Sequence, residues 1–422
     1  MKSKKIYYGW FVTLATFLST FISVGLAIYS FSIFVVPMSE ILSVPRTSIT
    51  VGSSLFTISM GIVGIFTGAQ VAKGYVRRLI AVGIVFVGSG YFLVSMASSL
   101  PMFYIAYILI GIGCACTGPV MTSSLLTAWF NKRRGLAVGI TSCGASVCAI
   151  IMPSLVSTIM NTGGIRTAYR ICGLIVVIVL FIAFLIIRPN PQSMGLYIDG
   201  QSKEEYEANI SRKGESGNRI GLNRGQAMRT ITFWMLCIAF AMLGFSQMGV
   251  MQNAAAFLND LSFESQTAAR ALSFIGLAGV FSTIISGWLA DRNPKATFCM
   301  GNVVLLIGTM FLLSTNQDSG FGWLMAYALF FGFGMGVWSS SLPLITSGLL
   351  GTKYFGAIWG VAFAVKSLCG DSLGAPVVSA IASVIGYRMA FMIPAVFLVL
   401  SAVLVLITRK PQAMIDLETS NL

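Results

Sequence analysis

The sequence of 422 residues contains no histidine, and only 9% of it is Asp, Glu, Lys or Arg, whereas 56% is hydrophobic. Histidine is the usual proton carrier near neutral pH, the commonest zinc ligand and the base of a Ser/His/Asp hydrolase. With so few charges, hardly any segment offers the polar face that a water-exposed helix needs. These absences exclude a soluble multidomain protein and argue against a hydrolase. We predict an all-α membrane protein that is not an enzyme.

The sequence also lacks recognisable metal, disulfide and nucleotide sites. Its eight cysteines fall inside apolar segments without paired spacing in loops, which is typical of small packing residues. No Walker-type glycine loop occurs, so we expect no ATP site and no cofactor or metal. The net charge of +14 comes from basic residues in the loops, a pattern that favours membrane insertion over nucleic-acid binding.

The apolar segments are long enough to cross a bilayer, whose hydrocarbon core takes about 20 helical residues. A polar stretch, residues 189–228, divides them into two sets of six and has the composition of a linker. We therefore predict six-helix bundles in residues 1–188 and 229–422. The predicted spans are residues 8–36, 48–72, 79–98, 102–129, 136–160, 168–188, 231–258, 267–290, 296–314, 321–349, 355–384 and 388–408.

Most of the 27 Lys and Arg residues fall in alternate loops, together with the linker and both chain ends. Membrane insertion retains basic loops in the cytoplasm, so this bias predicts a multi-pass protein of the cell membrane with both termini cytoplasmic. The two halves also resemble each other weakly. Gly68–Arg78 and Gly287–Lys295 follow corresponding spans, and Gly135–Gly139 corresponds to Gly356–Gly360. Such duplication is typical of transporters that rock two bundles about a central site.

Two ionisable side chains, Lys366 and Asp371, lie within the apolar spans, near the middle of the eleventh. An ionised group in hydrocarbon costs at least a few kcal/mol unless it faces protein or water, so the pair is a candidate functional site. At a spacing of five residues they lie about 140° apart on a regular helix, and we expect a direct ion pair to require unwinding near Gly370 or Pro376. Three interpretations stay open: Lys366 anchors an anionic substrate while Asp371 tunes it or carries a proton, the two form structural contacts, or Asp371 leads recognition of a cation or neutral amphiphile.

The segment Gly287–Lys295 resembles the loop motif of the major facilitator superfamily, in which an acidic residue and basic groups latch helix ends on the cytoplasmic side. The copy in the first half has Ala72 where the acid belongs, so that latch should be weaker or depend on its basic residues alone. The resemblance implies two six-helix bundles with twelve transmembrane helices. It also implies a cytoplasmic latch that comprises Asp291, Arg292, Lys73, Arg77, Arg78, Arg133 and Arg134.

Four segments resemble the branch of monocarboxylate transporters and oxalate/formate antiporters: Tyr8-Gly9-Trp10, Trp129–Ala137, Pro191–Gly200 and Phe233-Trp234. Members of that branch hold the substrate carboxylate with an arginine in the eighth span, and here Thr283 stands at its place. The oxalate/formate members also have a lysine in the eleventh span, where Lys366 lies about one turn from the family position. The resemblance implies secondary transport, but the missing arginine leaves the substrate open.

We expect the rest of the pocket to come from polar or aromatic residues on inward faces of the spans, of which Tyr29, Trp338, Gln247 and Gln252 are the main candidates. Each could instead serve packing or bond its own helix. The favoured function is transport of a small organic anion, a carboxylate, by a monomer using proton symport or anion exchange. The alternatives are an exporter of neutral or cationic amphiphiles and a membrane sensor that does not transport.

Overall fold

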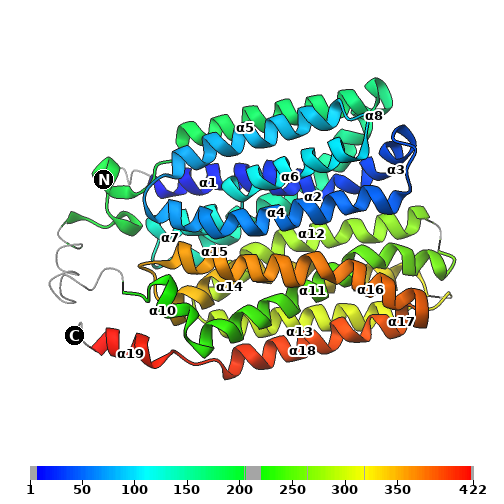
Figure 1. Ribbon diagram of the computed structural model, residues 1–422. Helices are drawn as coiled ribbons and strands as arrows, with labels where there is room; N and C mark the ends of the chain where they lie inside the picture. The colour runs from blue at the N-terminus through cyan, green and yellow to red at the C-terminus, as the bar shows by residue number, and fades with distance from the viewer. Residues whose placement is uncertain (1–6, 204, 206–219, 264, 318, 420–422) are drawn as a thin grey trace, which may run out of the picture.

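The computed structural model describes residues 7–203, 205, 220–263, 265–317 and 319–419 (Figure 1). Within these ranges the regular structure is helical, apart from one isolated bridge between Gly221 and Gly351. Residues 204 and 206–219, which belong to the predicted linker, lie outside the described residues. The boundaries proposed for the two bundles, at residues 188 and 229, therefore stay a prediction.

The first bundle is built from long helices joined by short turns. Its first span is divided by a π-helical turn, its fourth is interrupted at Gly118, and its last long helix bends at Gly164, whose φ of 75° breaks the helix. The elements are α1 (Gly9–Ser19), η1 (Thr20–Gly25), α2 (Leu26–Tyr29), α3 (Phe31–Ile41), α4 (Arg46–Ala72), α5 (Val76–Ser95), α6 (Leu100–Thr117), α7 (Pro119–Trp129) and α8 (Arg134–Ile186).

The second bundle follows two 3-10 turns, η2 (Pro191–Met194) and η3 (Ile198–Gly200), and the short helix α10 (Arg224–Met228). Its fifth span contains a second π-helical turn, η5 (Lys366–Asp371), which falls on the candidate site. The other elements are α11 (Ile231–Asp260), α12 (Ser265–Ala290), α13 (Pro294–Leu313), α14 (Phe321–Leu350), α15 (Phe355–Val365), α16 (Ser372–Ile385), α17 (Tyr387–Ala390), α18 (Met392–Ile407) and α19 (Gln412–Thr419).

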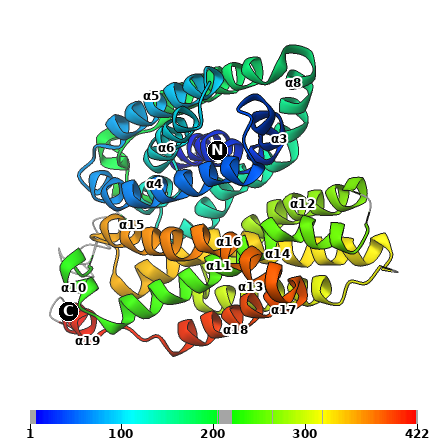
Figure 2. The same ribbon diagram turned by 45° about the vertical axis from the view of Figure 1, so that its right-hand side comes forward.

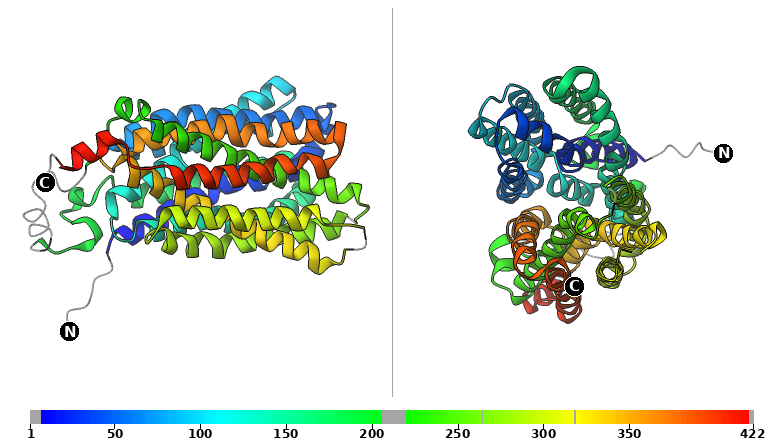
Figure 3. Two further views of the ribbon diagram at one scale, coloured as in Figure 1. Left: turned by 90° about the horizontal axis from the view of Figure 1, so that it is seen from below. Right: turned by 90° about the vertical axis from the view of Figure 1, so that its right-hand side faces the viewer.

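The predicted fold class is confirmed. Ten of the described helical segments are long and apolar enough to cross a membrane, one of them the 53-residue helix α8. Because α8 bends at Gly164, it supplies two antiparallel spans, and α12 completes the twelve. Figures 2 and 3 show the helices gathered into two bundles that lie side by side.

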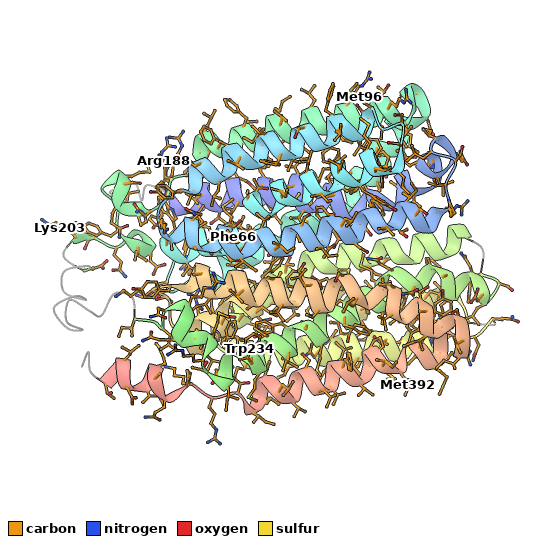
Figure 4. The ribbon with its side chains drawn as sticks, in the orientation of Figure 1. Phe66, Met96, Arg188, Lys203, Trp234 and Met392 are labelled. Carbon is orange, nitrogen blue, oxygen red and sulfur yellow. The ribbon has the colours of Figure 1, made fainter. Side chains whose placement is uncertain are left out.

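Both ends of the described chain, and the described residues on either side of 206–219, lie at the same end of the molecule, which we call the terminal face (Figure 1). Along the sides of the bundles, large apolar side chains point outward, among them Phe66, Met96, Trp234 and Met392 (Figure 4). Arg188 and Lys203 lie toward the terminal face in the same view. An outer surface this apolar suits hydrocarbon, because lipid tails need no polar partner.

Candidate functional site

A cavity of about 110 Å³ lies between the two bundles, near the middle of the spans. The described residues that line it include no Asp, Glu, Lys or Arg. Its wall combines hydroxyl groups, methionines and two indole rings. The lining from the first bundle is Thr20, Val24, Ile28, Tyr29, Pro119, Thr122, Ser123, Ser142, Ala145 and Ser146, and that from the second is Met248, Met251, Ile275, Gly276, Gly279, Thr283, Met335, Gly336, Trp338, Ser339 and Trp359.

The candidate ion pair lies behind this wall. The Lys366 ammonium donates to both oxygens of the Asp371 carboxylate, at 2.7 and 2.8 Å, and Lys366 is only 1% exposed. Neither residue lines the cavity. A direct pair does need a departure from the regular α-helix, as expected, and the departure is the π-helical turn η5, which includes Gly370 and brings residue i+5 over residue i.

The indole of Trp338 contacts the ion pair, and Trp338 also lines the cavity. Its ring centroid lies 4.3 Å from the Lys366 nitrogen, which is within the range of a cation–π interaction, and Trp338 itself lines the cavity. The ammonium is therefore held by an aromatic face on one side and by a carboxylate on the other. Trp338 thus connects the buried pair to the wall of the cavity.

Small residues let α11 approach the widened turn closely. A Cβ placed on Gly244 would strike the Asp371 carboxylate, and one on Gly370 would strike the backbone of Ala241. On the opposite side, the Ser367 hydroxyl donates to the Thr57 carbonyl of α4 at 3.1 Å. The pair therefore lies at a point where η5 touches both bundles.

The other predicted pocket residues lie in different places. Tyr29 and Thr283 line the cavity, and the Thr283 hydroxyl donates to the Val280 carbonyl at 3.0 Å. Gln247 and Gln252 do not line it. Gln247 is fully buried and both polar atoms of its amide lack a partner within the described chain, whereas Gln252 is exposed and donates to the Met248 sulfur.

Trp359 was missed by the sequence-based prediction. It lines the cavity from α15, is 1% exposed, and packs between the rings of Phe355, Phe363 and Phe240. Its indole nitrogen has no acceptor among the described residues. A tryptophan in an apolar span carries no signal that separates a packing ring from a cavity donor, so this position could be found only from the fold.

Two contacts between the bundles close the cavity toward the terminal face. At the first, which we call the latched junction, α8 and α12 touch at Gly135 and Gly287, where a Cβ on either residue would strike the carbonyl of the other. At the second, the unlatched junction, α4 and α15 touch in the same way at Gly68 and Gly356. Because backbone meets backbone, no solute passes between the helices at these points.

Asp291 belongs to the latched junction. Its carboxylate accepts hydrogen bonds from the backbone N–H groups of Gly135 and Leu136, at 2.5 and 3.0 Å, across the boundary between the bundles. These are unpaired donors of the first turn of α8, where a negative charge also meets the positive end of the helix dipole. Burial raises the pKa of Asp291, and the two amide bonds oppose that rise. Arg134 donates to the Ser347 hydroxyl of α14 beside it, which adds a second contact between the bundles.

The remaining basic residues of the predicted latch lie apart from this contact. Arg77 stacks on Phe184 and Arg78 on Tyr75, all within the first bundle, and Arg292 stacks on Trp288. Arg133 is exposed at the start of α8, and Lys73 is exposed at the end of α4. Asp199 has a role that the sequence motif did not reveal, since its carboxylate accepts from the N–H groups of Asn131 and Lys132, both at 3.0 Å.

Two six-helix bundles with a cavity between them, and backbone contacts that shut one side of it, define a multi-pass membrane transporter rather than an enzyme. The comparison with known proteins agrees. The family model of the Major Facilitator Superfamily matches residues 12–370, and the chain belongs to this superfamily.

Relatives by sequence include the oxalate:formate antiporter of Oxalobacter formigenes, which is 26% identical over 87% of this chain and 84% of its own, and the uncharacterized MFS-type transporter YhjX of Escherichia coli, which is 24% identical over 85% and 86%. The fold is similar to two solved structures. The human organic anion transporter MFSD10 has a TM-score of 0.71 at 13% identity and covers 96% of this chain and 100% of its own. The proton:xylose symporter XylE has a TM-score of 0.73 at 14% identity and covers 94% of each.

Proposed function

We propose that this transporter carries a small organic anion of the carboxylate class, and that Lys366 supplies the positive charge that binds it. The observation that carries the proposal is the ion pair of Lys366 and Asp371 beside the central cavity. A charge so deep in the membrane is expensive and is retained chiefly where it serves transport. The ammonium lies against the ring of Trp338, which lines the cavity.

The pair gives a mechanism for coupling. In the empty transporter Asp371 neutralises Lys366, so the buried ammonium is not left alone. An anion that enters the cavity, displaces the Trp338 ring and contacts Lys366 takes the place of Asp371. If Asp371 then binds a proton, the net charge stays neutral and the proton and anion move together; if a second anion replaces the first, the result is exchange. Proton symport and anion exchange are thus two uses of the same competition for Lys366.

One relative by sequence is the oxalate:formate antiporter, whose name states that it exchanges two carboxylates. In this chain Thr283 occupies the position at which that branch has an arginine. A guanidinium binds a carboxylate with a fixed pair of donors, whereas an ammonium is a point charge on a flexible stem. We therefore expect the anion site to be less selective for geometry than a site with both groups.

We also infer that the terminal face is cytoplasmic and that the protein lies in the cell membrane, because the basic loops are concentrated on that side. With both junctions in contact, the structure corresponds to a state closed to the cytoplasm. One chain holds both bundles and the whole cavity, so a monomer is sufficient for transport.

The test is uptake of a panel of labelled mono- and dicarboxylates by proteoliposomes at two pH values. Lys366→Gln should abolish uptake, and Lys132→Gln, which removes an exposed lysine, should not. Removing one partner of a buried pair costs about 3–5 kcal/mol and can prevent folding. The double variant Lys366→Gln with Asp371→Asn leaves no unpaired charge, so it should fold and still fail to transport. Carboxylate uptake by the folded double variant would overturn the proposal.

A second candidate, a transporter of neutral or cationic amphiphiles, is favoured by the lining of the cavity itself, where methionines and indoles occur and charged side chains do not. Methionine side chains adapt to apolar ligands of different shapes. If this candidate holds, lipophilic cations and neutral amphiphiles will stabilise the protein against heat, and the double variant at positions 366 and 371 will keep their transport.

A further inference from the structure

The two junctions are related by the internal duplication, and one of them lacks a group that the other has. Gly356 is the second residue of α15, as Gly135 is the second residue of α8, and each meets a glycine near the end of a helix of the other bundle. The residue four places after Gly287 is Asp291, and the residue four places after Gly68 is Ala72. The carboxylate that caps α8 therefore has no counterpart opposite α15.

A pocket of about 200 Å³ occupies the missing position. It is formed by the end of α4, the end of α7, the start of α15 and the residues after α8, and Ala72 and Gly356 both line it. At the latched junction, by contrast, the Asp291 carboxylate fills the corresponding space against Gly135. The unlatched junction therefore has space for an acidic side chain, but the residue at this position is Ala72.

The pocket has the chemistry of an anion site. Lys73 and Lys353 line it from opposite bundles, and none of its described lining residues is Asp or Glu. Within the described chain, no acceptor meets the N–H of Gly356, which points from the first turn of an 11-residue helix with no side-chain cap. Free N–H groups at such a helix start bind anions, and the helix dipole adds to the attraction.

A second, independent feature also indicates a ligand. Ser124 lines the pocket and is 7% exposed, and its buried hydroxyl has no hydrogen-bond partner among the described residues. It lies beside Gly356, since a Cβ on that glycine would be 3.0 Å from the hydroxyl oxygen. A buried hydroxyl without a partner costs stability, and an oxyanion in the pocket would accept its proton together with that of the Gly356 amide.

We propose that this pocket binds an oxyanion, the carboxylate or phosphate group of a molecule at the terminal face, which takes the place of the missing Asp at the unlatched junction. The bound anion joins Lys73 of the first bundle to Lys353 and the start of α15 in the second. It therefore favours the state in which the terminal face is closed. The site is separate from Lys366 and does not depend on which substrate the transporter carries.

The experiment measures thermal unfolding of the full-length protein, purified in a neutral detergent, with inorganic phosphate against chloride at equal ionic strength. Wild-type protein should show a saturable rise of about 1–3 °C with phosphate, because a ligand that binds the folded state stabilises it. Ala72→Asp supplies the carboxylate within the chain, so it should melt higher without phosphate and lose the response. Ala72→Asn, of the same shape but uncharged, should fill the space without the full gain in stability, which separates the effect of the charge from that of filling the pocket.

Two further variants locate the effect. Lys353→Ala should lose the phosphate response, which provides a test even if Ala72→Asp does not fold. The double variant Lys366→Gln with Asp371→Asn should keep the phosphate response, because those residues lie at the proposed substrate site and not at this pocket. If the response is lost only in this double variant, phosphate binds at the substrate site. That result would overturn the pocket proposal and leave the proposed function intact.

A parallel measurement in nanodiscs distinguishes the two sources of the anion. If phosphatidylglycerol stabilises wild-type protein over phosphatidylcholine and Lys353→Ala removes the effect, while inorganic phosphate does nothing, the ligand is a lipid headgroup. A response to inorganic phosphate in detergent identifies a free oxyanion. No response in either system, or a response that is unchanged in both Ala72→Asp and Lys353→Ala, would overturn the proposal.

Discussion

At the latched junction, Asp291 of one bundle holds the first amides of a helix in the other, whereas at the unlatched junction Ala72 leaves the corresponding amide of Gly356 facing a pocket lined by two lysines. The glycine contacts are the same at both, with backbone against backbone. The comparison separates two roles of the residues that close the junctions. The glycines determine where the bundles meet, and the charged groups determine how strongly they are held there.

Alternating access requires both junctions to open when the bundles rock. Any group that binds only the closed arrangement shifts the balance of states by its own binding free energy. An internal carboxylate does so permanently, while a pocket that takes its anion from outside the chain makes the contribution of one junction depend on what the surrounding solution or membrane supplies. The difference between Asp291 and Ala72 is thus a difference between a fixed and an adjustable contact.

The largest effect should come from breaking the contact that the two junctions share. In Gly68→Val, the new side chain strikes the Gly356 carbonyl, so the unlatched junction cannot close without a shift of backbone that costs about 1–3 kcal/mol. We expect the cavity to open to the terminal face. The measurement uses Ser142→Cys, because Ser142 lines the cavity. A thiol reagent that does not cross the membrane, applied to the terminal face, should label Ser142→Cys about tenfold faster when Gly68→Val is also present than when it is not.

The matched control for this prediction is Gly348→Val. Like Gly68, Gly348 lies inside a helix, in this case α14 of the second bundle, but a Cβ there meets nothing within 4 Å. Labelling at position 142 should be unchanged in this variant. Equal labelling of the Gly68→Val protein and its parent would show that the glycine contact does not close the gate.

Removing the carboxylate should have the next largest effect. Asp291→Ala loses two charge-assisted hydrogen bonds across the latched junction, which we expect to cost the closed state about 1–3 kcal/mol. Labelling at Ser142 should rise several-fold, and Asp291→Asn, which keeps one acceptor, should give a smaller rise. A variant that carries both Asp291→Ala and Ala72→Asp moves the carboxylate from the latched to the unlatched junction. Slow labelling of this variant would show that the two junctions are equivalent, and fast labelling would show that they are not.

Much of this architecture could be predicted from the sequence, because it follows from periodic and compositional signals. Twelve spans follow from the length of the apolar runs, and the duplicated glycine motifs at Gly135 and Gly356 indicate two related bundles. The embedded charges could be found for the same reason, since Lys366 and Asp371 stand out against hydrocarbon.

The details of the site depend on local geometry that composition does not encode. A regular helix places Lys366 and Asp371 on different faces, and only the π-helical turn brings them together. The contact of Trp338 with both the pair and the cavity, and the indole nitrogen of Trp359 that meets no acceptor among the described residues, arise from packing between distant spans. The pocket at Ala72 could be inferred from the degraded motif only as a weaker latch, because its second side belongs to α15.

A smaller effect is expected from Arg134, the second group that crosses the latched junction. Its guanidinium donates to the Ser347 hydroxyl of α14, so Arg134→Ala should lower stability by about 1 kcal/mol, measured as a fall in the midpoint of thermal unfolding. Arg133→Ala removes a neighbouring, exposed arginine and should change stability by less than about 0.5 kcal/mol. Similar shifts for the two variants would mean that the contact with Ser347 contributes nothing specific.

The smallest effect concerns Ser124 at the unlatched junction, and its sign is informative. Its buried hydroxyl has no partner in the part of the chain that the structure describes, so Ser124→Ala removes an unsatisfied polar group and should leave stability in chloride unchanged or raise it by up to about 1 kcal/mol. With phosphate the order should reverse, because the wild-type hydroxyl then donates to the anion.

Thr127→Ala is the matched control: Thr127 lines the same pocket, but its hydroxyl already donates to the Ser123 carbonyl at 2.8 Å. Thermal unfolding of the three proteins in chloride and in phosphate distinguishes these cases, and a loss of stability in Ser124→Ala without phosphate would show that the hydroxyl already has a partner within the protein.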